Sequence, residues 1–297
     1  MCRFVLYQGP AITLSSLVTE PSHSIVNQSV HADETEEPLN GDGFGLAWYV
    51  PELSASPALF RSVTPAWSNQ NLLELARVTR SGCVMAHVRA ATRGLPVAEI
   101  NCHPFTSGPY AFMHNGDVAR FGQIRRQLLA DLSDPAFSAI RGSTDSEHLF
   151  GVFLDEALSR EPHLHADRAA ALGDCLEAAL RRVLGLVDRA KAALPAPAGT
   201  DDDDSWINAA VSDGTCSAAV RFTSASDEPS SLYVHSGRRY VCDAGVCRLV
   251  EPGPGEATAI IASEKLSEDP GWERVPRNHL VLVREDGTVV TRPLVLD

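Results

Sequence analysis

Cys2 directly follows Met1, and this position can bring two reactive groups together on one residue. If Met1 is removed, residue 2 carries both a thiol and a free α-amine. An unperturbed thiol has a pKa of about 8.5 and an α-amine one of about 7.7–8.0, so neutral amine is present near neutral pH to accept the thiol proton. The position therefore predicts an N-terminal nucleophile with its own general base. The alternative is a cysteine that stands there by chance, because such a motif needs structural context.

An Asn-Gly pair offers donors for the oxyanion that forms when a thiolate attacks an amide. Asn115 supplies a side-chain amide, and Gly116 supplies a backbone N–H that no side chain hinders. The alternative interpretation is a hairpin turn, because Asn-Gly is a strong turn signal.

Two charged residues can hold an amino-acid substrate by its α-carboxylate and α-ammonium groups. Arg89 lies in a mostly apolar segment, where a guanidinium is costly to bury without an anionic partner, and it can bind a carboxylate in bidentate fashion. Thr92 is a neighbouring hydroxyl donor, and Asp145 can pair with the ammonium group. The structural alternatives are a salt bridge for Arg89 and a first-turn acid, favoured by the helix dipole, for Asp145.

Three histidines stand close to these residues in the sequence. His87, His103 and His114 could each act as a general acid, but a hydrogen-bonded structural histidine is the preferred interpretation. His103 precedes Pro104, which favours an extended backbone at that point.

Composition narrows the classes of partner. The 297 residues include 38 acidic and 25 basic side chains, for a net charge of −13, which disfavours nucleic acid. The sequence contains no run of about 18 apolar residues, so we expect no membrane span. The N-terminal segment does not resemble a secretory signal. We therefore expect a cytoplasmic protein whose partner is a small molecule.

The seven cysteines are scattered and odd in number, so we expect reduced thiols rather than a disulfide framework. Cys102 and His103 are too close together for a zinc knuckle, and Cys242 and Cys247 have no matching second pair. The sequence therefore predicts neither a metal site nor a cofactor.

The elements that must position these residues are predicted from hydrophobic periodicity. Strands are expected at 2–8, 42–50, 83–90, 110–116, 207–213, 216–222, 231–236, 257–263 and 279–283. Helices are expected at 69–78, at 121–132, from a capping box at Thr144 and Glu147, and at 167–194.

The order of strands, helices and strands predicts an α+β fold, a four-layer αββα sandwich. Residues 195–204 carry prolines, glycine and four consecutive aspartates, so we expect an acidic flexible loop near 195–205 within a single domain spanning 2–297.

Six motifs occur in the order MCRF, GDGFG, AHVRAATRG, NCHPF, MHNG and GSTDSE, and together they resemble the class II glutamine amidotransferases, the Ntn-hydrolase type with an N-terminal cysteine. The resemblance covers about residues 1–150 closely and extends weakly to the end. It implies an Ntn-hydrolase fold with two mostly antiparallel sheets between helical layers.

The resemblance also implies a role for each candidate residue. Cys2 would be the nucleophile and its amine the base, Arg89 and Asp145 would grip the glutamyl α-carboxylate and α-amino group, Asn115 and Gly116 would form the oxyanion hole, and His103 and Thr92 would line the glutamine pocket.

One position departs from the family pattern. The family commonly has an aromatic residue directly after the arginine, and this sequence has Ala90. This difference alters the expected lid of the pocket and leaves room for a larger leaving group.

The motif contexts look closest to stand-alone γ-glutamyl amidohydrolases of glutathione degradation and of the ergothioneine pathway. The resemblance thus implies hydrolysis of a γ-glutamyl amide through a Cys2 thioester, with release of glutamate. Alternatives are a glutaminase subunit that passes ammonia to a separate synthetase and a non-catalytic γ-glutamyl-binding scaffold. A partner subunit or a homo-oligomer is compatible with each of these. A thiol redox sensor that uses Cys102 or the pair Cys242 and Cys247 ranks last.

Overall fold

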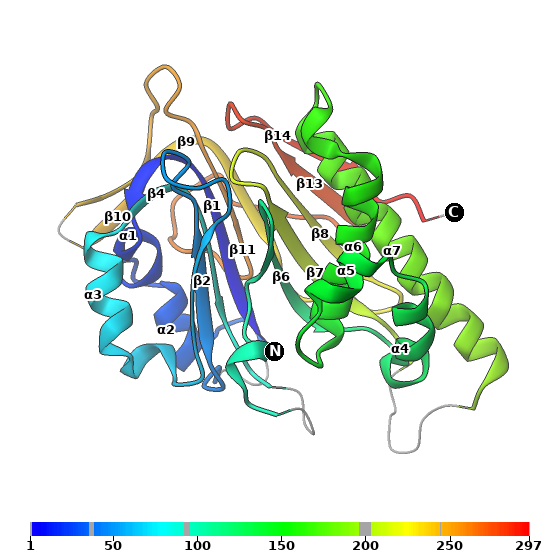
Figure 1. Cartoon of the computed structure of the whole chain (residues 1–297). Coiled ribbons are helices and arrows are strands. Elements are labelled where there is room, and N and C mark those ends of the chain that lie inside the picture. Colours follow the sequence, from blue (N-terminus) through cyan, green and yellow to red (C-terminus); the bar gives the residue numbers. More distant parts are fainter. Residues whose placement is uncertain (1, 36–38, 92–95, 196–202, 244, 297) are drawn as a thin grey trace.

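The computed structural model describes residues 2–35, 39–91, 96–195, 203–243 and 245–296. Their strands form two sheets that pack face to face between two layers of helices (Figure 1). Every strand pair of the described residues is antiparallel. The arrangement confirms the predicted αββα sandwich.

The first sheet has the strand order β10-β9-β11-β1-β4-β2-β3, with β12 paired to β9. Its strands are β1 (Arg3–Thr13), β2 (Phe44–Trp48), β3 (Ala58–Ser62), β4 (Arg80–Val88), β9 (Tyr233–Asp243), β10 (Val246–Val250), β11 (Thr258–Ala262) and β12 (Glu273–Arg274).

The second sheet has the order β14-β13-β8-β7-β6-β5. Its strands are β5 (Phe105–Ser107), β6 (Tyr110–Asp117), β7 (Trp206–Ser212), β8 (Ser217–Thr223), β13 (His279–Val283) and β14 (Val289–Pro293).

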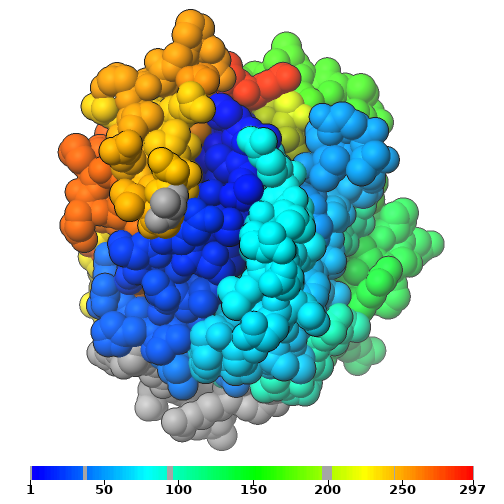
Figure 2. Space-filling view, turned by 90° about the vertical axis from the view of Figure 1, so that its left-hand side faces the viewer, coloured from blue at the N-terminus to red at the C-terminus, as the bar shows by residue number. Residues whose placement is uncertain are grey.

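The helices form the two outer layers (Figure 1). The first sheet is covered by α1 (Ser15–Val18), α2 (Ile25–Val30) and α3 (Gln70–Val78), and the second by α4 (Phe121–Ala130), α5 (Asp134–Ala139), α6 (Asp145–Arg160) and α7 (Arg168–Ala193). Short 3-10 turns occur at Ala66–Ser68, Glu99–Asn101 and Pro162–Leu164. Figure 2 views the molecule from the side of α1–α3, where α3 (cyan) lies beside the dark blue N-terminal segment.

Strand β1 shows why its apolar sequence favours this architecture. Successive side chains of a strand point to opposite faces. Phe4 and Leu6 enter the core between the sheets, whereas Val5 and Tyr7 pack under the outer helices. Both faces are buried, so the strand reads as a continuous apolar run.

Helix α6 begins where its capping signal predicts. The hydroxyl of Thr144 accepts a hydrogen bond from the N–H of Glu147 at 3.2 Å. The Glu147 carboxylate accepts bonds from the N–H groups of Arg141 and Gly142 instead of reaching back to Thr144, so only half of the capping box forms.

Cys242 and Cys247 face each other across the β9–β10 pair and form a disulfide, so the prediction of reduced thiols is wrong for them.

The predicted acidic loop falls largely on 196–202, outside the described residues. Asp203, which follows those residues, forms an ion pair with Arg120 at 2.7 Å.

None of the helices described here has the length and apolar character needed to cross a bilayer.

Candidate active site

Cys2 directly precedes β1, a central strand of the first sheet. Arg3 pairs with Val88 across β1 and β4, so Cys2 lies beside the end of β4, and its thiol donates a hydrogen bond to the carbonyl of Ala90 at 3.4 Å. Strand alternation places Cys2 on the same face as Phe4, which points between the sheets. The thiol thus faces the second sheet.

Burial raises the pKa of the Cys2 thiol above its usual value, against the opposing effects of the Ala90 carbonyl contact and the Arg89 charge. The thiol is therefore protonated near neutral pH. Reaction as a thiolate would require a base close to the sulfur.

The main chain of Cys2 is held by its neighbour Arg3. The guanidinium donates to the Cys2 carbonyl at 2.8 Å and to the Glu264 carboxylate at 2.7 Å. Glu264 also accepts bonds from the N–H groups of Asp33 and Glu34. No local pattern could predict this contact, because 261 positions separate Arg3 from Glu264.

Although burial alone would raise it, the pKa of the Glu264 carboxyl falls to about 2, because hydrogen bonds from His23 and two backbone N–H groups and the Arg3 charge stabilise its anion. His23, Asp33 and Glu264 lie close enough to share a cation. Since Arg3 already binds Glu264, an ion pair accounts for this cluster.

Asn115 and Gly116 lie within β6, so the turn interpretation of this dipeptide is wrong. Alternation along β6 places Asn115 on the inter-sheet face together with Met113. Both polar atoms of the Asn115 amide are buried and have no hydrogen-bond partner within the described part of the chain. Gly116 has a φ of 121°, and a Cβ there would collide with the carbonyl oxygen of Trp206.

Arg89 follows β4 directly and is buried, with 3% exposure. Its guanidinium makes a long contact of 3.5 Å to the carbonyl of Pro96, and no ion pair to it occurs among the residues that the structure describes. The salt-bridge alternative therefore finds no partner in those ranges. Thr92, the neighbouring hydroxyl candidate, lies outside the described residues.

Asp42 holds the chain around Arg89 and was missed from the sequence. Its carboxylate accepts the N–H of Ala91 at 2.8 Å, and its own N–H donates to the Arg89 carbonyl at 3.0 Å. The GDGFG motif also needs its glycines for close packing, because a Cβ at Gly43 would lie 2.7 Å from the sulfur of Cys102.

Asp145 opens α6 with its carboxylate bound to two backbone N–H groups. Val118 donates to one oxygen and Ser146 to the other, both at 2.8 Å. Burial raises the pKa of the Asp145 carboxyl, and these hydrogen bonds oppose the shift.

Two of the three candidate histidine rings pack against each other, and the third, that of His114, contacts Ser146 of α6 instead. The rings of His87 and His103 stack at 4.2 Å, and the Nε2 atom of His87 lies 3.2 Å from the carbonyl oxygen of His114 on the other sheet. Burial lowers the pKa of His87 to about 3 and that of His114 to about 4, and it also lowers the pKa of His103 well below the usual value. All three imidazoles are neutral near pH 7. His87 and His114 have hydrogen-bond partners, which fits a structural role, whereas both ring nitrogens of His103 are buried without a partner among the described residues.

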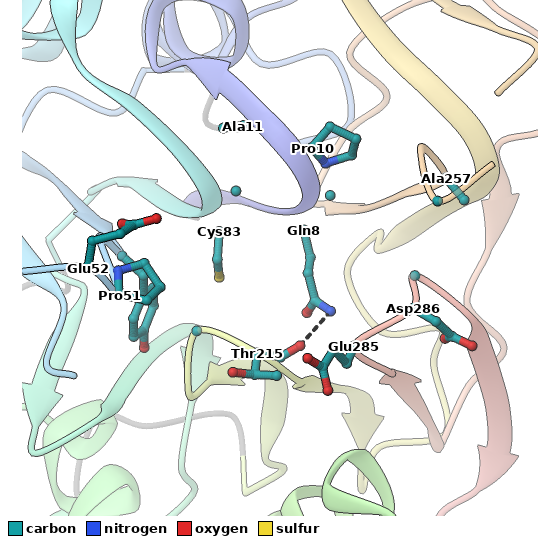
Figure 3. A pocket seen from close by; sticks show the side chains of 16 residues that line it. Gln8, Pro10, Ala11, Pro51, Glu52, Cys83, Thr215, Ala257, Glu285 and Asp286 are labelled. Atoms are coloured by element: carbon teal, nitrogen blue, oxygen red, sulfur yellow. Dashed lines mark hydrogen bonds between the residues drawn. The ribbon is translucent and has the colours of Figure 1, made fainter. Parts of the chain in front are cut away.

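A cavity of about 550 Å³ lies toward the other end of β1 (Figure 3). Gln8, Cys83 and Glu285 are among its lining residues, and none of the candidate site residues is. The Gln8 amide is engaged with the Thr215 carbonyl, and burial raises the pKa of the Cys83 thiol to about 12. The Cys83 thiol in this cavity lies 3.3 Å from the hydroxyl of Ser212, so the polar groups of Gln8 and Cys83 both have partners.

Comparisons with known proteins agree with the motifs. A family model described as "Glutamine amidotransferases class-II" matches residues 16–185, which is more than half of the chain. The "Probable glutamine amidotransferase DUG3" of Saccharomyces cerevisiae is 38% identical, over 99% of this chain and 85% of the yeast protein. The "Gamma-glutamyl-hercynylcysteine sulfoxide hydrolase" of Mycolicibacterium smegmatis is 27% identical, over 98% of this chain and 99% of that protein.

Solved structures give the same picture. A glutamine aminotransferase class-II domain protein from Silicibacter pomeroyi superposes with a TM-score of 0.62 at 26% identity, over 99% of this chain and 100% of that chain. Glutamine phosphoribosylpyrophosphate amidotransferase from B. subtilis shares the fold at 13% identity, with a TM-score of 0.58 over 100% of this chain and 50% of that chain.

Proposed function

This chain belongs to the class II glutamine amidotransferases, an Ntn-type family, and is an amidohydrolase-type enzyme. On that premise we propose that it hydrolyses the γ-glutamyl amide bond of a small molecule through a thioester on Cys2, releasing glutamate.

In this proposal the glutamyl group is held at both ends. Arg89 binds the α-carboxylate and Asp145 binds the α-ammonium group, while the scissile carbonyl lies between the sulfur of Cys2 and the donors of Asn115 and Gly116. The observation that carries the proposal is the buried Arg89 next to Cys2, without an ion partner in the described residues. A buried guanidinium is costly unless an anion neutralises it, and a substrate carboxylate would do so.

The reaction would proceed in two halves. After removal of Met1, the α-amine of Cys2 accepts the thiol proton, and the thiolate attacks the γ-carbonyl carbon. Asn115 and Gly116 stabilise the oxyanion, and the protonated amine then gives its proton to the leaving nitrogen as the C–N bond breaks. In the second half the same amine takes a proton from water, whose oxygen attacks the thioester. Glutamate leaves and the thiol is restored. The raised pKa of the Cys2 thiol is consistent with the need for this base.

We further propose that the leaving amine is larger than ammonia. Ala90 stands at the position where an aromatic residue is common in the family, and its carbonyl contacts the sulfur of Cys2. Its small side chain leaves room beside the sulfur for a larger leaving amine. The mycobacterial relative is named for a γ-glutamyl conjugate with a bulky amine component. We carry that substrate class, and not that particular compound, over to this chain.

The proposal is tested with a panel of glutamine, γ-glutamyl peptides and γ-glutamyl conjugates, and with glutamate release as the measurement. Protein that has lost Met1, verified by intact mass, is expected to release glutamate from peptides or conjugates. Cys2→Ala is expected to release none, whereas the control Cys83→Ser, a thiol in the remote cavity, should stay active. Trapping with substrate should add one glutamyl group to Cys2.

Other outcomes distinguish the alternatives. Turnover of glutamine alone, and only after addition of a partner subunit, would identify a glutaminase component. Binding of γ-glutamyl compounds without turnover would identify a scaffold. Full activity of Cys2→Ala, or full activity of protein that retains Met1, would refute the mechanism.

A further inference from the structure

Strand β6 supports two parts of the proposed site at once. Asn115 and Gly116 belong to the strand, and Val118 directly after it donates its N–H to the carboxylate of Asp145 at 2.8 Å. The proposed oxyanion donors and the proposed ammonium-binding carboxylate are thus attached to one short stretch of extended backbone.

A second contact attaches the start of α6 to the same strand. The hydroxyl of Ser146 lies 2.8 Å from Nδ1 of His114, and both side chains are buried. Ser146 also donates its backbone N–H to Asp145 at 2.8 Å. Two sets of hydrogen bonds therefore hold the Asp145 carboxylate near β6. One is direct, from the N–H of Val118, and the other runs through Ser146 to His114.

These two ties fix the distance from the Asp145 carboxylate to the donors at Asn115 and Gly116. Extended backbone is already close to its full length, at about 3.3 Å per residue, and cannot adjust by stretching. The imidazole of His114 lies on the side of β6 that faces the helices, on the same face as Phe112, and is neutral near pH 7. The arrangement therefore sets a fixed distance between the groups proposed to bind the two ends of a glutamyl substrate.

We propose that the His114–Ser146 hydrogen bond determines chain-length specificity, so that γ-glutamyl amides are hydrolysed in preference to β-aspartyl amides. A β-aspartyl amide is one methylene shorter between the α-ammonium carbon and the scissile carbonyl. With its ammonium group on Asp145, its carbonyl would fall short of the oxyanion donors, and a misplacement of about 1 Å can cost about 10²-fold in rate. Ser146 and His114 are positioning residues in this account, and the inference rests on the proposed function.

The test compares kcat/KM for a γ-glutamyl and a β-aspartyl amide that share the leaving amine best accepted in the panel. Wild-type protein is expected to prefer the γ-glutamyl compound strongly. In Ser146→Ala the ratio should fall by about tenfold or more, mainly through a lower kcat for the γ-glutamyl amide, because the bound carbonyl is less well aligned. Ser146→Thr keeps the hydroxyl and should restore the ratio.

Ser159→Ala is the matched control, since Ser159 is exposed near the other end of α6 and its hydroxyl donates to the Glu156 carbonyl of the same helix. The ratio of two substrates is independent of the fraction of folded enzyme, so partial unfolding of a variant does not alter the result. An unchanged ratio in Ser146→Ala would overturn this inference and leave the proposed function standing. Wild-type protein that hydrolyses neither amide would overturn both.

Discussion

Asn115 and Gly116 are neighbours in β6, yet different physical requirements fix their identities. The amide of Asn115 is buried without a hydrogen-bond partner in the described residues, so it contributes no internal bond to stability. Gly116 is fixed by backbone geometry, because its φ of 121° and the nearby Trp206 carbonyl leave no room for a Cβ.

Asn115→Ala is therefore expected to lose activity without losing stability. Removal of one oxyanion donor typically lowers kcat by about 10²–10³-fold. The matched control is Asn208→Ala on the neighbouring strand β7, because the Asn208 amide donates to the carbonyls of Ser230 and Ser231. That variant should instead lose about 1–3 kcal/mol of unfolding free energy, measured by urea titration. If Asn115→Ala retained wild-type kcat, Asn115 would have no role as a donor.

Gly116→Ala, unlike Asn115→Ala, should lose stability. Strained φ values for residues with a Cβ cost about 1–3 kcal/mol, and the collision with Trp206 adds to this. We expect a lower midpoint of urea unfolding, measured by circular dichroism. Gly108→Ala gives the cost of mild strain without a collision, since Gly108 has a φ of 53°, in the left-handed region, and no atom near the position of a Cβ. Equal losses in the two variants would show that the collision contributes nothing.

Residue types revealed much of the candidate site but few of its supports. Cys2, Arg89 and Asn115 stand out in the sequence because each is a reactive or polar residue in an apolar context. Ser146 and Asp42 do not, because their roles come from hydrogen bonds to chain segments that only the fold brings near.

At the scale of elements, β1 is tied to the end of β11 by the ion pair of Arg3 and Glu264, which are both 1% exposed. The guanidinium also donates to the Cys2 carbonyl, so the same ion pair stabilises the fold and positions the proposed nucleophile.

The pH dependence of stability follows from the Glu264 carboxyl. Its pKa is lowered from an ordinary 4.5 to about 2 in the folded protein, so it contributes stability that is fully present above about pH 4.5 and lost as the pH falls toward 2. In urea unfolding between pH 2 and 7, Glu264→Gln should be less stable than wild type at neutral pH, and the difference should shrink below about pH 4.5. A difference that stays constant with pH would contradict this assignment.

Elements with a buried periodic pattern were predictable, whereas edge strands were not. Helix α7 was expected at 167–194 and spans Arg168–Ala193. Strands β3, β5, β10, β12 and β14 were missed, because they are short or only partly buried. Such strands form because a neighbouring strand offers its hydrogen bonds, and a local pattern does not record that neighbour. Helices α1, α2 and α5 were also missed, because helices of 4 or 6 residues are too short to show a helical period.

At the scale of the whole molecule, both ends of the chain enter one core. Phe4 from β1 and Val281 from β13 pack in the same cluster between the sheets. We propose on this basis that residues 2–297 form a single domain.

The disulfide lies far from the candidate site along β1. Cys242 and Cys247 approach the carbonyl of Ser16, just beyond the far end of β1, the strand that Cys2 precedes. Reduction by dithiothreitol, or the variant Cys242→Ser, should leave kcat/KM for the best substrate unchanged. The short loop that this disulfide closes also predicts only a small loss of thermal stability. A large change in activity on reduction would instead support a redox role for this pair.

The proposed nucleophile and its oxyanion donors belong to different sheets, and the side chains between those sheets set how far apart they lie. A substitution at Phe4 or Met113 that altered the thickness of this layer would shift Cys2 against Asn115 without touching any group that meets the substrate. Hydrostatic pressure would act on the same layer. Catalytic rate in this enzyme should therefore respond to compression of its interior, and natural variation in core volume offers a route to tune turnover from a distance.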